Sequence, residues 1–278
     1  MIDPAALVAR APIETRHSLT PQDSILYALG IGAEELRFVY EAELRALPMM
    51  AVTLAYPGFF WRDPRYGADW KRILHGEQSV MLHRPLPSGG EFIGHTRFDG
   101  VEDKGADKGA VVLVTRTIHG ADGIHYATDR RTAFLRGDGG CGSAGAAIPR
   151  PEPAPADTSP DAVVSIPTAA NQAKLYRLSG DLNPLHVDPQ VARAAGFDRP
   201  ILHGLCSYGV AGRAILRLLA GDDPARLKRL DARFSAPVYP GETIETQIWR
   251  ESDAAARFEA RVVERDVRVL THGYAELA

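Results

Sequence analysis

The chain has 278 residues, of which 45% are hydrophobic and 24% are charged, values that are ordinary for a globular protein with one large domain or two of usual size. The formal net charge is -3, so the charge balance gives no indication of binding to nucleic acid or to an anionic membrane surface. The only two cysteines, Cys141 and Cys206, exclude a disulfide framework and favour a reducing compartment.

The N-terminal residues 1–20 have the composition of a loosely held arm and lack the continuous apolar core of a signal peptide. Thr20, followed by PQD, predicts the N-cap of a helix that ends at the nearby glycines Gly30 and Gly32. A second helical start follows in residues 33–35. Residues 47–55 (LPMMAVTLA) are apolar nearly all round, which predicts a buried helix wrapped by a sheet.

From Gln78 onward the apolar period changes to two, which predicts four strands in QSVMLHRPL, EFIGHTRFDGVED, GAVVLVTRTIHG and IHYATDRRTAFL. A helix followed by an antiparallel meander is an α+β unit. Residues 137–160 consist mainly of Gly, Ala, Pro and Ser and form the clearest linker in the chain. We therefore expect an N-terminal domain at 1–136, this linker, and a C-terminal domain at 161–278.

The second half repeats the order of the first. It offers a short strand (AVVSIP), a helix ending at Gly180 (NQAKLYRLSGD), a short helix ending at Gly196, the long apolar helix GLCSYGVAGRAILRLLA, and four further strands. YALGIG from Tyr27 also aligns with YRLSGD from Tyr176. Under this alignment the first half has Gly and Arg where the second has Asp181 and His186, so we expect one functional site, in the second half.

The segment from Tyr176 to Cys206 gathers the polar residues Asp181, Asn183, His186 and His203. Asp-x-Asn-Pro is good turn chemistry in which the side chains satisfy their own backbone, so a plain turn is one interpretation. The other is an acid/base pair, because Asp181 and His186 on one short rigid loop can act on the same water while Asn183 orients it. The flanking apolar helices favour the second interpretation.

Metal sites fit this segment poorly. Pro184 and Ala192 contradict a calcium loop, because Ala192 stands where a bidentate Glu is required. A zinc site built from His186, Asp188, His203 and Cys206 has no standard ligand spacing. Cys206 is better explained as a small buried residue than as a nucleophile. We expect no metal.

Three other features have both a structural and a functional interpretation. Gly204, after His203, opens the long helix, either as a simple helix start or as an anion site made by free N–H groups and the positive helix end. The DKGADKG turn is a mobile hairpin tip, or its lysines meet phosphates of a large substrate. The HGEQ stretch from His75 caps a strand or contacts a ligand from the first half.

These motifs together closely resemble hydratase 2, the (R)-specific enoyl-CoA hydratases of the MaoC-like group. The resemblance spans both halves and rests on YALGIG, DWKRILHGEQ, RPLP, DKG, YRLSGDLNPLHVDP, RPILHGLCSYG and ARFSAPVYPGE. It implies a double hotdog fold in which each half is an antiparallel sheet wrapped round one long helix. It also implies that the C-terminal half is catalytic and that the N-terminal half widens the acyl pocket.

By position, the resemblance implies that Asp181 and His186 form the catalytic pair, that Asn183 supports them, and that the Gly204 amide binds the thioester oxygen. The residues that it places at the substrate site are His75, Gly76, Lys104, Leu182, Pro184, Leu185 and Phe234; Lys108 is an alternative to Lys104 because the DKG motif is doubled.

The implied reaction is reversible hydration of trans-2-enoyl-CoA to (3R)-3-hydroxyacyl-CoA. It requires no metal or organic cofactor, since CoA is part of the substrate. A non-catalytic acyl-CoA-binding module and a hotdog thioesterase are the alternatives. We expect a cytoplasmic protein with no membrane span and no nucleic-acid partner, and a homodimer. The acyl group and the pathway are left open.

Overall fold

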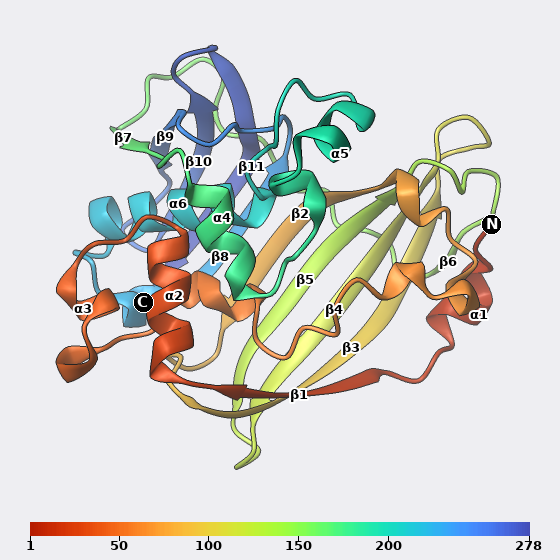
Figure 1. The fold of residues 1–278 in the computed structure, drawn as a ribbon, viewed down its shortest axis with the longest axis horizontal. Helices are drawn as coiled ribbons and strands as arrows, with labels where there is room; N and C mark the ends of the chain where they lie inside the picture. The colour runs from red at the N-terminus through yellow and green to blue at the C-terminus, as the bar shows by residue number, and fades with distance from the viewer.

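The computed structural model describes residues 1–278 and is dominated by one antiparallel sheet of 11 strands (Figure 1). Its strands are β1 (Ile13–Leu19), β2 (Ile73–Leu82), β3 (Gly90–Asp103), β4 (Ala110–Gly120), β5 (His125–Leu135), β6 (Ala144–Gly145), β7 (Ala162–Pro167), β8 (Leu227–Phe234), β9 (Thr243–Arg250), β10 (Ala255–Val262) and β11 (Val267–Leu277). The α-helices are α1 (Pro4–Val8), α2 (Pro21–Gly30), α3 (Leu36–Val39), α4 (Gln172–Tyr176), α5 (Pro189–Ala194) and α6 (Gly204–Leu219). No helix combines the length and apolar character needed to cross a bilayer.

The strand order shows the repeat directly. The first half is ordered β1-β3-β4-β5-β2 and the second β7-β9-β10-β11-β8, and the two halves join where β2 pairs with β8. The predicted double hotdog is therefore confirmed. The edges of β2 and β8 would be open if the two halves were separate, and their pairing inside one chain satisfies the backbone groups of both strands.

The predicted strands form because their apolar residues alternate. In β10, Ala256, Phe258, Ala260 and Val262 are buried and the intervening residues are half-buried. Alternate side chains of a strand point to opposite faces, so one face of β10 joins the core while the other meets solvent. This core contains residues of both halves.

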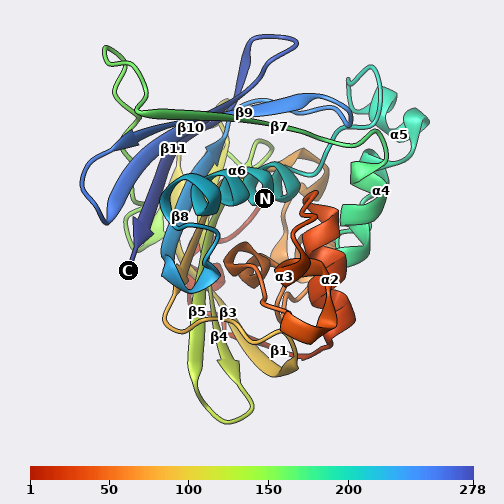
Figure 2. The ribbon, with the colours of Figure 1, turned by 90° about the vertical axis from the view of Figure 1, so that its left-hand side faces the viewer.

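The helix α6 lies along the inner face of the second half of the sheet (Figure 2). Two glycines allow the first half to pack against it. A Cβ on Gly209 would lie 2.5 Å from Ile31 Cγ2, and one on Gly212 would lie 2.5 Å from Met49 Cγ. These distances are too short for any side chain, so the close approach of the halves requires glycine at both positions.

The prediction of a buried helix in residues 47–55 was right about burial and wrong about the type of helix. This stretch holds a 3-10 helix, η2 (Pro48–Val52), whose five residues are all buried. No side chain caps its start, and Pro57 and Gly58 follow. So short an apolar stretch cannot form a stable helix by itself, and it fills the concave face as a tight turn. The inference of one long helix in each half therefore holds only for the second half.

The N-terminal arm was also predicted wrongly. Asp3 caps α1 by accepting a hydrogen bond from the Ala6 N–H, and Ile2 and Leu7 are buried. The strand β1 then pairs with β3 along all seven of its residues. Its inward positions include Thr and His as well as apolar residues, so the apolar alternation is too weak to reveal the strand.

In the predicted linker at 137–160, the structure has only the short strand β6. The predicted domain limits stay a prediction.

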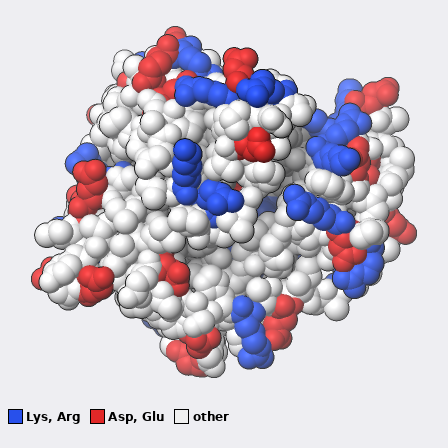
Figure 3. Space-filling view, in the orientation of Figure 1, with Lys and Arg blue, Asp and Glu red and all other residues white.

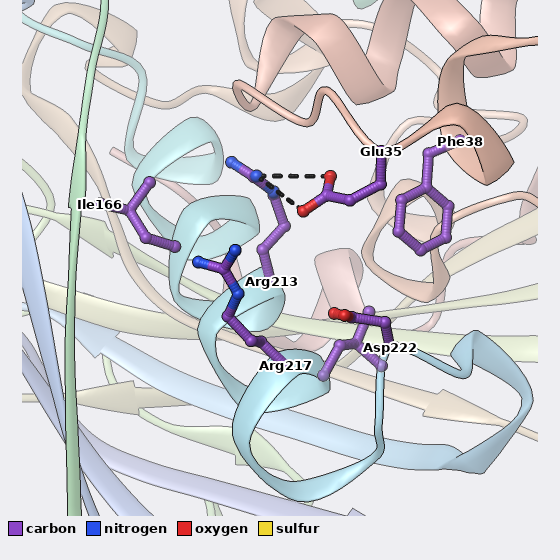
Figure 4. A pocket seen from close by; sticks show the side chains of 7 residues that line it. Glu35, Phe38, Ile166, Arg213, Arg217 and Asp222 are labelled. Carbon is purple, nitrogen blue, oxygen red and sulfur yellow. Dashed lines mark hydrogen bonds and ion pairs between the residues drawn. The ribbon is translucent and has the colours of Figure 1, made fainter.

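The second half also caps the end of α2, whose predicted N-cap at Thr20 is confirmed. The last carbonyls of a helix have no partner within the helix. Here Gln172 donates to the carbonyl of Leu29 (3.0 Å), and Arg213 of α6 donates to that of Ile31 (3.1 Å). Arg213 also reaches Glu35 at 3.3 Å (Figure 4). These contacts fix α2, in the first half, against the second half.

Candidate active site

The loop between α4 and α6 holds the Asp181–His186 pair in a fixed backbone. Gly180, at φ 116°, ends a 3-10 turn in a left-handed conformation that favours glycine. Asp181 Oδ1 then accepts the Asn183 N–H at 3.1 Å, and Asn183 Oδ1 accepts the Leu185 N–H at 3.2 Å. The turn interpretation is therefore correct for the backbone. It leaves the other carboxylate oxygen of Asp181 free for chemistry.

Three polar side chains converge on one point. Single atoms of Asp181, His186 and His203 all lie within 4.8 Å of one another, a spacing that suits a shared water and is also compatible with a metal ion. The rings of His186 and His203 stack with centroids 3.6 Å apart. His186 and His203 are buried, whereas Asp181 is exposed. The loop and the start of α6 thus bring an exposed acid and two buried imidazoles together.

The hydrogen bond of His186 defines its chemical form. Its Nδ1 lies 2.9 Å from the backbone carbonyl of Ile201, and a carbonyl only accepts. The proton of the neutral ring is therefore on Nδ1, which leaves a lone pair on Nε2. Burial lowers the pKa of His186 from its usual 6.5, so the ring is neutral near pH 7. His186 is thus prepared to act as a base through Nε2.

His203 is a site residue that the sequence grouped with Asp181 and His186, and considered as a zinc ligand, but to which it assigned no part in the acid/base pair. Its Nε2–H donates to the backbone carbonyl of Asp181 at 3.1 Å, and its buried Nδ1 has no partner. Burial and the adjacent His186 lower the pKa of His203 to about 4. The available signal was its position: His stands at an N-cap, where Ser, Thr, Asp or Asn is usual, and makes no capping bond.

The other side of the site is formed by Gly204 and Phe234 of the second half together with His75 of the first half. Gly204 is the first residue of α6, and its N–H has no acceptor in the protein. A Cβ on Gly204 would lie 3.1 Å from a ring carbon of Phe234 at the end of β8. The ring of Phe234 in turn packs on His75 of β2, with centroids 4.8 Å apart. Burial lowers the pKa of His75 to about 4, with Arg131 adding to the effect and Asp181 opposing it.

The remaining residues named from the sequence fall into two groups. Leu182 and Pro184 are exposed and Leu185 is half-buried, all on the Asp181 loop. Gly76 forms a bulge in the pairing of β2 with β5, where a Cβ would lie 2.7 Å from the Thr132 hydroxyl. Gly76 is thus needed for the backbone turn beside His75, and the roles of all four residues toward a substrate stay a prediction.

Lys104 makes its ion pair within its own hairpin and not with the loop that carries Asp181. It forms an ion pair with Glu102 in its own hairpin, and the next acid, Asp103, accepts N–H groups of Gly105 and residues 140 and 142. The structure has no hydrogen bond or ion pair between this hairpin and the loop at 181–203, and Lys108 is exposed. A phosphate contact by Lys104 or Lys108 stays a prediction.

The four-residue zinc site considered from the sequence does not assemble. Asp188 caps α5 by accepting the Gln190 N–H at 2.7 Å. The thiol of Cys206 donates to the carbonyl of Gly30, and burial raises its pKa well above the usual value. Cys206 therefore stays a protonated, buried side chain, as expected, and is no nucleophile.

A cavity of about 230 Å³ adjoins the site from the first half. Gly180 and Ser179, directly before Asp181, form one wall, and the rest comes from β1, α2 and η2. The other residues that line the cavity include Leu19, Leu26, Tyr27, Met50, Thr53 and Leu178. The sequence did not reveal this cavity, because its walls come from segments far apart in the chain.

The chain matches known families over both halves. Residues 17–137 match the MFE-2 hydratase 2 N-terminal domain, and residues 152–272 match the MaoC like domain. The chain is 41% identical over 262 residues to 3-hydroxyacyl-thioester dehydratase Y of Mycobacterium tuberculosis, covering 89% of this chain and 87% of that protein. It is 38% identical to mouse peroxisomal multifunctional enzyme type 2, covering 94% of this chain but only 36% of that protein.

Among solved structures, a MaoC-like dehydratase from Phytophthora capsici superposes with a TM-score of 0.89 at 35% identity, covering 98% of this chain and 97% of the other. The similarity therefore extends over the whole double hotdog, including the loop that carries Asp181 and His186.

Proposed function

The chain belongs to the MaoC-like hydratase 2 family, and on this basis we propose that it catalyses the reversible addition of water to trans-2-enoyl-CoA, giving (3R)-3-hydroxyacyl-CoA. The observation that carries the proposal is the convergence of Asp181, His186 and His203 at the start of α6, beside a cavity. The names of the relatives support a lyase acting on acyl thioesters, either as a hydratase or, in reverse, as a dehydratase.

Asp181 and His186 would hold the reacting water between them. The Nε2 lone pair of His186 accepts one proton while the water oxygen bonds to C3 of the substrate. The carbon–carbon double bond then becomes an enolate of the thioester. The proton taken from the water returns to C2 through His186 or Asp181 on the same face. Both groups end in their starting states, and one water has been added.

Gly204 would stabilise the enolate. Its N–H is free and stands at the positive end of α6, a helix of 16 residues. A preoriented donor of this kind lowers the energy of the transition state most when negative charge develops on the oxygen that it binds. Phe234 sits against Gly204 and would limit where the thioester can lie.

The cavity beside Gly180 would take the acyl chain. Most of its walls are side chains of the first half, which lacks the Asp/His pair: Gly32 and Arg37 stand where the alignment places Asp181 and His186. The first half would therefore bind the acyl group while the second half performs the chemistry.

We further propose that the reaction uses no metal or organic cofactor, because it moves only a hydroxide and a proton. A cytoplasmic location and a homodimer complete the proposal. Two free cysteines are typical of a reducing compartment, and β1 and β7 are free sheet edges at which a second copy could pair.

The test is a hydration assay with purified protein and trans-2-enoyl-CoA substrates of several chain lengths. We expect the ultraviolet absorbance of the conjugated thioester to fall and chiral analysis to give the 3R product. Release of free CoA, followed with a thiol reagent, would indicate a thioesterase instead. Binding without either reaction would indicate a non-catalytic module.

A further inference from the structure

The inner face of the first half carries two arginines and one carboxylate. Arg116 of β4 and Asp129 of β5 form a fully buried ion pair at 2.9 Å. Arg116 also donates to the backbone carbonyls of Ala51 and Val52, and Gln78 donates to Asp129. Asp129 thus has its charge balanced by Arg116 alone.

Arg131 has no such partner. It lies two residues after Asp129 on the same face of β5, is half-buried, and makes no ion pair or side-chain hydrogen bond in the protein. Its guanidinium packs 4.7 Å from the ring centroid of Tyr56 and 5.8 Å from that of Phe60. The Tyr56 ring also faces Arg116 at 5.4 Å. Because arginine stays protonated, one positive charge on this face remains unbalanced.

Arg131 lies next to the proposed site. In the pairing of β2 with β5, His75 is opposite Ala133, which is two residues from Arg131 on the same face. His75 packs on Phe234, and Phe234 faces Gly204. The charge of Arg131 acts on His75, lowering its pKa, while those of Asp129 and Asp181 oppose that effect. His75 is itself neutral at pH 7, so it carries no charge beside Arg131.

The surroundings of Arg131 suit an anion. A half-buried cation loses part of its hydration and gains most from an oxygen anion that approaches the guanidinium. The aromatic rings of Tyr56 and Phe60 hold the guanidinium in place without neutralising it. On the outside of the molecule, Figure 3 shows Lys and Arg side chains near the middle of the face that it draws, with Asp and Glu side chains among them.

We propose that Arg131 is an anion-binding residue of the substrate site, which holds either a carboxylate at the far end of the acyl group or a phosphate of CoA. This rests on the proposed hydratase function and adds to it a substrate class. The two sources share one chemistry, an anionic oxygen facing a planar guanidinium, and they differ in whether the charge is on the acyl chain or on the carrier.

The test compares Arg131→Met with the wild type on four enoyl thioesters of equal length. These carry either a methyl or a carboxylate at the end of the acyl chain, each on CoA or on N-acetylcysteamine, which has no phosphate. Arg130→Met is the matched control, because Arg130 is exposed on the opposite face of the same strand. Arg131→Lys tests whether a positive charge alone restores activity.

We expect Arg131→Met to lower kcat/KM by about tenfold or more where the anion is present, as for loss of a hydrogen bond to a charged group. A loss on both carboxylate substrates identifies the acyl end, and a loss on both CoA substrates identifies the phosphate. The uncharged N-acetylcysteamine thioester should react normally. Arg131→Lys should recover part of the loss, and Arg130→Met should change nothing.

An equal loss on all four substrates, or no loss on any, overturns this inference while leaving the hydratase function in place. An equal loss accompanied by a shifted pH profile would instead assign Arg131 an effect on the charge of Asp181. A wild-type protein that hydrates none of the four contradicts the proposed function itself.

Discussion

Replacing Gly204 with Ala tests the proposed oxyanion site without removing its N–H. The new Cβ would lie 3.1 and 3.2 Å from two ring carbons of Phe234, whereas ordinary contact begins at 3.4 Å. Either the Phe234 ring or the start of α6 must therefore shift by a few tenths of an ångström. Phe234 has little room to move, because its ring rests on His75 at 4.8 Å.

Overpacking of this kind typically costs about 1–3 kcal/mol. If the cost appears in the transition state, where each 1.36 kcal/mol changes the rate tenfold, kcat/KM should fall by roughly 5- to 150-fold. The variant should fold, since only one methyl group is added. Initial hydration rates measure the loss, and thermal unfolding followed by circular dichroism confirms that the fold is retained.

The double variant Gly204→Ala with Phe234→Leu supplies the decisive control. A smaller side chain at 234 removes the ring carbons that the new methyl group meets, so the double variant should be more active than expected from the two single changes. The reasoning is refuted if Gly204→Ala keeps wild-type kcat/KM, or if the effects of the two changes simply add.

Three further outcomes follow from the site. Asp181→Ala or His186→Ala should each lower kcat by at least about 100-fold with an unchanged melting temperature, and near-normal turnover in either would contradict the acid/base assignment. The pKa of His75 and of His203 is lowered to about 4 from the usual 6.5, so between these pH values the unfolded chain binds more protons than the folded one. The unfolding free energy should therefore fall as the pH drops from 6.5 toward 4, and His75→Gln should flatten the dependence of melting temperature on pH; an equally steep dependence in that variant would contradict the burial argument. Removing metals with a chelator should leave hydration unchanged, and activity that is lost with the chelator and restored by a divalent ion would instead show that Asp181, His186 and His203 bind a metal.

Local signals in the sequence were sufficient for the main helix ends of both halves and for most of the strands. The N-cap at Thr20, the stops at Gly180 and Gly196, and the helix from Gly204 all depend on residues close together in the chain. The alternating strands were found for the same reason, since period-two burial is written directly in the sequence. The loop from Asp181 to His186 also forms by short-range hydrogen bonds, so its role as a single unit was foreseeable.

Features decided by distant residues were missed or wrong. The apolar stretch at 47–55 carried enough hydrophobicity for a buried helix, but only the packing of Met49 against Gly212 of α6 shows that a compact 3-10 turn fills that space. The strand β1 depends on pairing with β3 for its hydrogen bonds, which its own weak alternation does not reveal.

The residues themselves determined the duplicated architecture, the single Asp181–His186 pair and the glycine at the start of α6, because each depends on local backbone chemistry or on the repeat. Only the tertiary structure decided that His203 joins the pair, that His75 and Phe234 close over Gly204, and that Arg131 is left without a counter-charge. Each of these contacts joins residues that are distant in the chain, and the contact of His75 with Phe234 also joins the two halves, so no local pattern specifies them.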